Sequence, residues 1–160
     1  MIENELYVRR DNVGSILPIK DFEKQKSNGV LIVDDMLMMR LILSSILKDA
    51  GIPILGEAAN GQKALELYAR TQPSVVLLDL LMPVMDGFST LEKLLNYDPK
   101  ANVIICSSLQ QKFYISRALK SGAKDFLIKP FRPDAVKRLV GSLIHGHTVI
   151  HQYPRYLMID

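Results

Sequence analysis

The chain has 160 residues, of which 48% are hydrophobic and 23% charged, and its formal net charge is +3. This length and balance fit one folded domain and exclude a largely disordered or fibrous chain. No apolar run is long enough to span a membrane, no secretory signal opens the chain, and the single Cys106 excludes an internal disulfide, so a cytoplasmic protein is expected.

Short apolar runs alternate with amphipathic stretches along most of the chain, which is typical of an α/β fold with a parallel sheet. Four nearly continuous apolar runs, at 30–33, 74–80, 102–106 and 125–129, predict strands buried on both faces. A fifth strand is predicted at 52–58. It contains Pro53, which cannot donate a ladder hydrogen bond, so it belongs at an edge of the sheet.

Five helices are predicted between and after these strands, at 36–50, 60–71, 88–97, 110–121 and 133–145. Gly51 ends the first of them, Asn60 caps the second, and Pro133 suits the first turn of the last. With right-handed crossovers and an edge-type second strand, the elements predict a doubly wound, five-stranded parallel sheet in the order 2-1-3-4-5.

The predicted α/β unit covers 29–145 and leaves two shorter segments. Residues 1–28 are read as an N-terminal extension or linker, and 146–160 as a C-terminal tail. Both contain apolar residues, so we expect them to pack together or onto a neighbouring subunit.

Polar and charged side chains stand at the carboxyl ends of four predicted strands. These residues are Asp34 and Asp35 after the first strand, Asp79 in the third, Ser107 after the fourth and Lys129 in the fifth. Ligands of open α/β sheets bind outside the carboxyl ends of the strands, so these side chains are expected to form one site.

Three neighbouring carboxylates repel one another unless a cation lies between them. Oxygen ligands without histidine or cysteine favour Mg²⁺, and a carboxylate such as Asp79 can attack phosphorus to form an aspartyl phosphate. Lys129 and the Ser107 hydroxyl would neutralise the phosphoryl oxygens. Taken singly, each of these residues also has an ordinary reading as a helix cap, a turn residue or a surface charge.

Four motifs in order resemble the receiver family of response regulators, typified by the chemotaxis response regulator, over residues 30–143. They are DD at 34–35, VVLLDLLMPVMDG at 75–87, IICSS at 104–108 and DFLIKPF at 125–131. The resemblance implies a flavodoxin-like fold and a signalling switch that is not an enzyme acting on a metabolite.

The resemblance also implies a role for each matching acidic position. Asp79 would be the phosphoacceptor, Asp35 a direct Mg²⁺ ligand, and Asp34 a ligand through water or an orienting acid. The backbone carbonyl of Leu81 would complete the protein's share of the coordination.

Three further roles follow from the resemblance. Ser107 matches the Ser/Thr that moves to bond the phosphoryl group, Phe126 the aromatic residue that swings inward with it, and Lys129 the lysine after the fifth strand. The Lys129–Pro130 bond would be cis.

Two apolar residues depart from positions that are often polar in the family. Leu81 lies two residues beyond Asp79, and Leu109 two beyond Ser107. Neither can orient a hydrolytic water, so a long-lived phosphoryl group is expected.

The expected partners are a histidine kinase or phosphotransfer protein and a downstream protein that binds the fourth helix, fifth strand and fifth helix. Residues 112–138 carry eight basic side chains against two acidic ones, a pattern that fits an acidic partner surface and solvated helix faces equally well. A homodimer is a further alternative. Membrane binding is not expected, and no nucleic-acid motif accompanies the charge.

Two competing functions share the chemistry. A haloacid-dehalogenase-type phosphatase needs an acid two residues past the nucleophile, where this chain has Leu81. A fragment of a DNA-binding regulator would look the same over this length.

Overall fold

Five parallel strands form one sheet in the order β2-β1-β3-β4-β5 in the computed structural model, which describes residues 26–147. The strands are β1 (Ser27–Val33), β2 (Ile54–Ala58), β3 (Pro73–Asp79), β4 (Val103–Ser107) and β5 (Asp125–Ile128). The predicted strand order and the doubly wound, flavodoxin-like fold are therefore confirmed.

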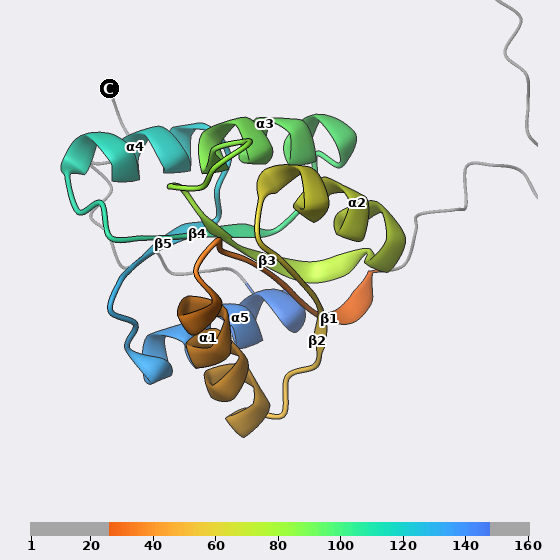
Figure 1. The fold of residues 1–160 in the computed structure, drawn as a ribbon. Coiled ribbons are helices and arrows are strands. Elements are labelled where there is room, and N and C mark those ends of the chain that lie inside the picture. The colour runs from red at the N-terminus through yellow and green to blue at the C-terminus, as the bar shows by residue number, and fades with distance from the viewer. Residues whose placement is uncertain (1–25, 148–160) are drawn as a thin grey trace, which may run out of the picture.

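Helices cover both faces of this sheet (Figure 1). On one face lie α1 (Leu37–Asp49) and α5 (Pro133–Ile144), and on the other lie α2 (Gly61–Thr71), α3 (Gly87–Tyr97) and α4 (Lys112–Lys120). Right-handed βαβ crossovers produce this division, because the strand order reverses between β1 and β3.

The sheet separates two apolar cores, and the alternation of side chains along β1 assigns residues to each. Val30 and Ile32 face the core under α1 and α5, whereas Leu31 and Val33 face the core under α2, α3 and α4. All four are essentially inaccessible to solvent. Burial of each such side chain contributes about 1.5–3 kcal/mol, which fixes the register of the strands.

Strand β2 lies at the sheet edge, as the sequence predicts, although Pro53 itself precedes the strand. The Pro53 carbonyl accepts a hydrogen bond from the backbone N–H of Val30 at 2.9 Å. Proline has no N–H to donate, so this carbonyl is the backbone group through which Pro53 pairs with β1.

Most element boundaries differ from the sequence prediction by one to three residues, including the starts of β1 and α4. Strand β1 begins at Ser27, three residues earlier than its apolar run, because the Ser27 N–H donates to the Gln72 carbonyl at 2.8 Å. Helix α4 is shorter than predicted and begins at Lys112, after a Gln111 that provides no side-chain cap. Backbone pairing and capping, which hydropathy does not report, set both boundaries.

Three predicted helix ends are confirmed, namely the starts of α2 and α5 and the end of α1. Asn60 caps α2 by accepting a hydrogen bond from the Lys63 N–H at 2.8 Å, and Pro133 opens α5. Gly51 follows α1 with a left-handed φ of 69°, a conformation that glycine adopts without strain.

No helix within residues 26–147 is long and apolar enough to cross a membrane. The expected extension, 1–28, and tail, 146–160, lie almost wholly outside this range, and so does their expected packing.

Candidate metal and phosphoryl site

The residues predicted to form the site meet at the carboxyl edge of the sheet. Asp79 ends β3 and pairs with Cys106 of β4, while Ser107 ends β4 and pairs with Ile128 of β5. Asp34 directly follows β1, and Lys129 directly follows β5. Because the four strands are parallel neighbours, their last residues stand side by side.

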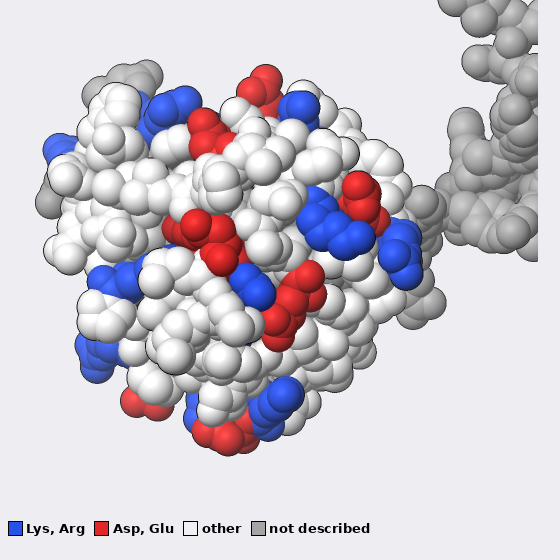
Figure 2. Space-filling model, viewed as in Figure 1, with Lys and Arg blue, Asp and Glu red and all other residues white. Residues whose placement is uncertain are grey.

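Three carboxylates form a cluster at this edge. Ligand oxygens of Asp34, Asp35 and Asp79 all lie within 4.8 Å of one another. Asp34 and Asp79 are buried and Asp35 is exposed, so the cluster opens to solvent on one side. Figure 2 shows a group of acidic atoms near the centre of the face it presents. The all-carboxylate donor set, partly open to water, fits Mg²⁺, which keeps several of its waters.

Lys129 lies against two of these carboxylates. Its Nζ is 2.6 Å from Asp34 Oδ2 and 3.5 Å from Asp79 Oδ1. Burial lowers the pKa of Lys129, but the hydrogen bond to Asp34 and the charge of Asp79 outweigh burial, so the pKa is raised overall. Lys129 is therefore a permanent positive charge at the site.

The pKa of the Asp79 carboxyl is raised by its surroundings. Burial raises its pKa from 3.8 to about 6; the charge of Asp34 also raises it, and Lys129 opposes both. A buried carboxylate that is costly to ionise gains from a cation or from covalent modification, which are the two events expected at this position.

Asp34 combines a site position with an ordinary local one. Its Oδ1 accepts a hydrogen bond from the Met36 N–H at 2.9 Å at the entrance to α1, while its Oδ2 accepts from Lys129. The turn alternative raised from the sequence thus describes one of its oxygens, since Met36 is the N-cap of α1 and no side chain caps that helix. The other oxygen belongs to the cluster.

Two residues that the sequence did not single out hold this edge in place. Arg40 Nη1 donates to the Asp34 carbonyl at 2.8 Å, and Arg40 Nε lies 3.2 Å from Glu57 Oε2. Gly87 lies so close to β3 that a β-carbon there would be 2.2 Å from the Asp79 carbonyl oxygen. The sequence pair Asp86–Gly87 at the start of α3 could have indicated the role of Gly87. No local sequence pattern indicates the role of Arg40.

The remaining predicted residues surround the cluster at different depths. Ser107 is fully buried, and its hydroxyl accepts from the Leu109 N–H at 3.2 Å. Phe126 is fully buried in the core beneath α4. The Leu81 N–H donates to Asp79 Oδ1 at 3.4 Å, while the Leu81 side chain is exposed.

The Lys129–Pro130 peptide bond is cis, as the resemblance implied.

The doubly wound sheet with an acidic cluster at its carboxyl edge is the arrangement of a receiver fold. The chain belongs to the response regulator receiver domain family, whose model matches residues 30–141. Receiver domains of this family are signalling switches that bind Mg²⁺ at an acidic pocket.

Two proteins related to this chain are similar to it in sequence. The chain is 43% identical over 107 residues to the chemotaxis protein CheY of Thermotoga maritima, an alignment that covers 67% of this chain and 89% of that one. It is 42% identical over 118 residues to protein CcdB of Bacillus subtilis, covering 74% of this chain and 98% of the relative.

A solved structure is also similar to this chain in fold and in sequence. A CheX–CheY–BeF3–Mg complex from Borrelia burgdorferi contains a chain that matches with a TM-score of 0.70 and 33% identity, over 74% of this chain and 90% of that one. The chain is thus similar to CheY proteins over nearly their whole length.

Proposed function

We propose that this chain is a response regulator in which Asp79 accepts a phosphoryl group in a Mg²⁺-dependent reaction. The observation that carries the proposal is the contact geometry of Asp79, which is buried among two carboxylates and one lysine at the carboxyl edge of the sheet.

In the proposed step, an Asp79 carboxylate oxygen attacks phosphorus, a new O–P bond forms, and the bond from phosphorus to the donor's imidazole nitrogen breaks. Lys129 faces the incoming phosphoryl oxygens with its fixed charge, and the Ser107 hydroxyl turns from Leu109 to donate to them. Phe126 then adjusts its packing within the core. These are the contributions of positioning and charge that phosphoryl transfer requires.

Asp35 and Asp79, with Asp34 as an orienting acid or a ligand through water and the Leu81 carbonyl, would hold the Mg²⁺. When bound, the ion would supply the positive charge that the three carboxylates lack and would neutralise phosphoryl oxygens.

The phosphodonor, a histidine kinase or phosphotransfer protein, has an apolar surface to bind next to the cluster. Met36, Leu37, Met38 and Leu41 are exposed on α1, directly after Asp35. A contiguous exposed apolar patch is typical of a protein-binding surface, and methionine adapts to varied partners.

The output is proposed to pass through the surface made by α4, β5 and α5 to a protein with an acidic docking surface. Homodimerisation through this surface is an alternative. The cytoplasmic location expected from the sequence stays a prediction, as does the absence of substrate turnover, for which Leu81 offers no general acid.

The proposal is tested with the small phosphodonor acetyl phosphate and the full chain, with phosphorylation followed by intact-mass spectrometry. We expect one phosphoryl group per chain with Mg²⁺, none with EDTA, and none in Asp79→Asn. Asp134→Asn, which removes an exposed carboxylate from the first turn of α5, is the matched control and should be phosphorylated like the wild type. Undiminished phosphorylation of Asp79→Asn would refute the assignment.

A further inference from the structure

Two adjoining hollows lie on the α3–α4 side of the molecule, away from the acidic cluster. One, of about 320 Å³, lies between the two helices and is lined by Phe88, Glu92 and Leu95 of α3 and by Arg117 of α4. The other, of about 580 Å³, runs along α4 from Lys112 past Phe113 to Lys120 and Ser121. Arg117 and Ser121 line both, so the hollows form one groove, which we call the α3–α4 groove.

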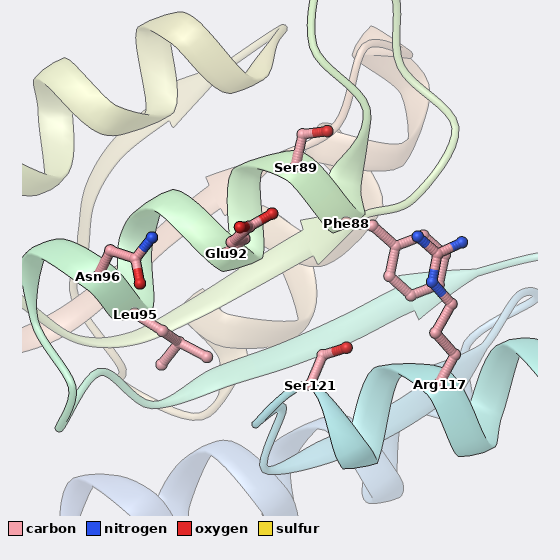
Figure 3. Close-up of a pocket in the computed structure, with 7 residues that line it drawn as sticks. All are labelled: Phe88, Ser89, Glu92, Leu95, Asn96, Arg117 and Ser121. Atoms are coloured by element: carbon pink, nitrogen blue, oxygen red, sulfur yellow. The ribbon is translucent and has the colours of Figure 1, made fainter.

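Aromatic side chains give this groove an apolar floor. Phe113 is 66% exposed on the outer side of α4, opposite the buried Ile115. The Arg117 guanidinium lies 3.9 Å from the centroid of the Phe88 ring. Figure 3 shows Arg117 against Phe88, with Leu95 further along α3. A single exposed apolar residue is ordinary, but aromatic and aliphatic side chains gathered in a hollow are typical of a binding surface.

The groove is lined mainly by basic residues. Lys112, Arg117 and Lys120 line it from α4, and Glu92 is the single acidic residue among the lining residues described. Figure 2 shows basic side chains at the α4 end of the face it presents. A ligand with acidic groups around an apolar anchor would complement both the charge and the floor.

The groove does not coincide with the output surface proposed above. Arg117 lines the hollow between α3 and α4, and Phe113, one helical turn earlier, is exposed to solvent. Strand β5 lies beneath α4 instead (Figure 1). A groove between two roughly parallel helices accepts a third helix, whose anchors repeat every three to four residues.

We propose that the α3–α4 groove is a second docking site, which binds an acidic amphipathic helix of a partner protein. An apolar side chain of that helix packs against Phe113 and Phe88, and its carboxylates face Arg117 and the lysines of α4. This proposal does not depend on the phosphorylation of Asp79.

The probe is a synthetic amphipathic peptide of about 16 residues, with Leu and Phe at i, i+3, i+4 and i+7 and Glu on the flanks. Its affinity for the full chain is measured by fluorescence anisotropy, and its binding site by amide chemical-shift changes. We expect shifts concentrated in α3 and α4, and affinity about tenfold weaker for Phe113→Ser, for Arg117→Glu and for a peptide with Gln in place of Glu.

Arg70→Glu is the matched control, because Arg70 is exposed in the last turn of α2, outside both the groove and the proposed output surface, and carries the same charge change. It should bind the peptide as the wild type does. Thermal unfolding checks that Phe113→Ser and Arg117→Glu, both at exposed positions, remain folded.

Four outcomes would overturn the proposal. They are no binding to the wild-type chain, equal weakening by Arg70→Glu, displacement of the peptide by duplex DNA of equal charge, and self-association that Phe113→Ser abolishes. The last two would assign the groove to nucleic acid or to a second copy of the chain.

Discussion

At the scale of single residues, the cost of keeping Asp79 ionised has a consequence for stability. Its raised pKa means that the folded protein binds this proton more tightly than the unfolded chain does. The carboxylate therefore costs nothing below about pH 4, an increasing amount as the pH rises towards 6, and its full amount above pH 6. Burial of Asp79 at the metal site therefore lowers the free energy of unfolding of the metal-free protein at neutral pH.

We predict that Asp79→Asn is more stable than the wild type at about pH 7.5 in EDTA, by about 2 kcal/mol. Asparagine is neutral and removes the cost of burying the charge. Urea unfolding monitored by circular dichroism measures the difference, which should shrink as the pH falls towards 4. Lower stability of Asp79→Asn at neutral pH, or a difference independent of pH, would contradict the raised pKa.

Leu81 bears on the lifetime of the phosphoryl group. Its side chain is 56% exposed, so replacing it should leave the core intact. We predict that Leu81→Asn loses phosphate several-fold faster than the wild type, because an amide can orient a water for attack on phosphorus. Phosphate release after removal of the phosphodonor measures the rate.

Leu41→Asn serves as the control for this prediction, since it makes the same change at an exposed position on α1. Its phosphate lifetime should match that of the wild type. Equal lifetimes for all three proteins would remove Leu81 from any role in protecting the phosphoryl group.

At the scale of elements, the packing of α3 against the end of β3 positions Asp79. The Gly87 N–H donates to the Leu80 carbonyl at 2.9 Å, and its missing side chain lets the helix start touch the strand. Asp86 caps the same helix by accepting from the Ser89 N–H at 2.8 Å. The loop from Asp79 to α3 is therefore held at both ends.

We predict that Gly87→Ala destabilises the protein by about 1–3 kcal/mol and weakens Mg²⁺ binding, because the new methyl group displaces the Asp79 backbone. Gly141→Ala in α5 is the control, since its β-carbon would meet no atom within 4 Å. That change should instead stabilise the helix by about 0.5–1 kcal/mol. Unfolding curves and magnesium titration of both variants test the contrast, and an unchanged metal affinity in Gly87→Ala would contradict it.

At the scale of the whole molecule, the two ends of the sheet carry different groups of polar residues. The carboxyl end carries the acidic cluster, and the opposite end carries a network that joins Lys26, Tyr68 and Asp98. The Tyr68 hydroxyl donates to Asp98 Oδ2 at 2.6 Å, and Lys26 hydrogen bonds to both partners and lies over the Tyr68 ring. Burial raises the pKa of Asp98, but its hydrogen bonds outweigh burial and lower the pKa overall.

We predict that Tyr68→Phe lowers stability by about 1–2 kcal/mol while leaving magnesium affinity unchanged, because it removes one charge-assisted hydrogen bond far from the site. Tyr114→Phe is the control, since the Tyr114 hydroxyl makes no hydrogen bond within residues 26–147. Thermal unfolding and magnesium titration separate the two readouts. A loss of metal affinity in Tyr68→Phe would show that the two ends of the sheet are coupled.

The order of the strands, the edge position of β2 and the meeting of Asp34, Asp79 and Lys129 at one edge could all be predicted from the sequence. These features follow from local hydropathy, from Pro53 and from the geometry that every parallel sheet shares. Motif matching added the family and the cis bond before Pro130, which the structure confirms.

Which atoms meet across the site could be learned only from the folded structure. It paired Lys129 more closely with Asp34 than with Asp79, placed Arg40 on the Asp34 carbonyl, and set Phe88 of α3 against Arg117 of α4. Such contacts join residues far apart in the chain, and they depend on how helices pack on the sheet. Periodicity reports which face of an element is buried, but it does not report which side chain of a neighbouring element lies against it.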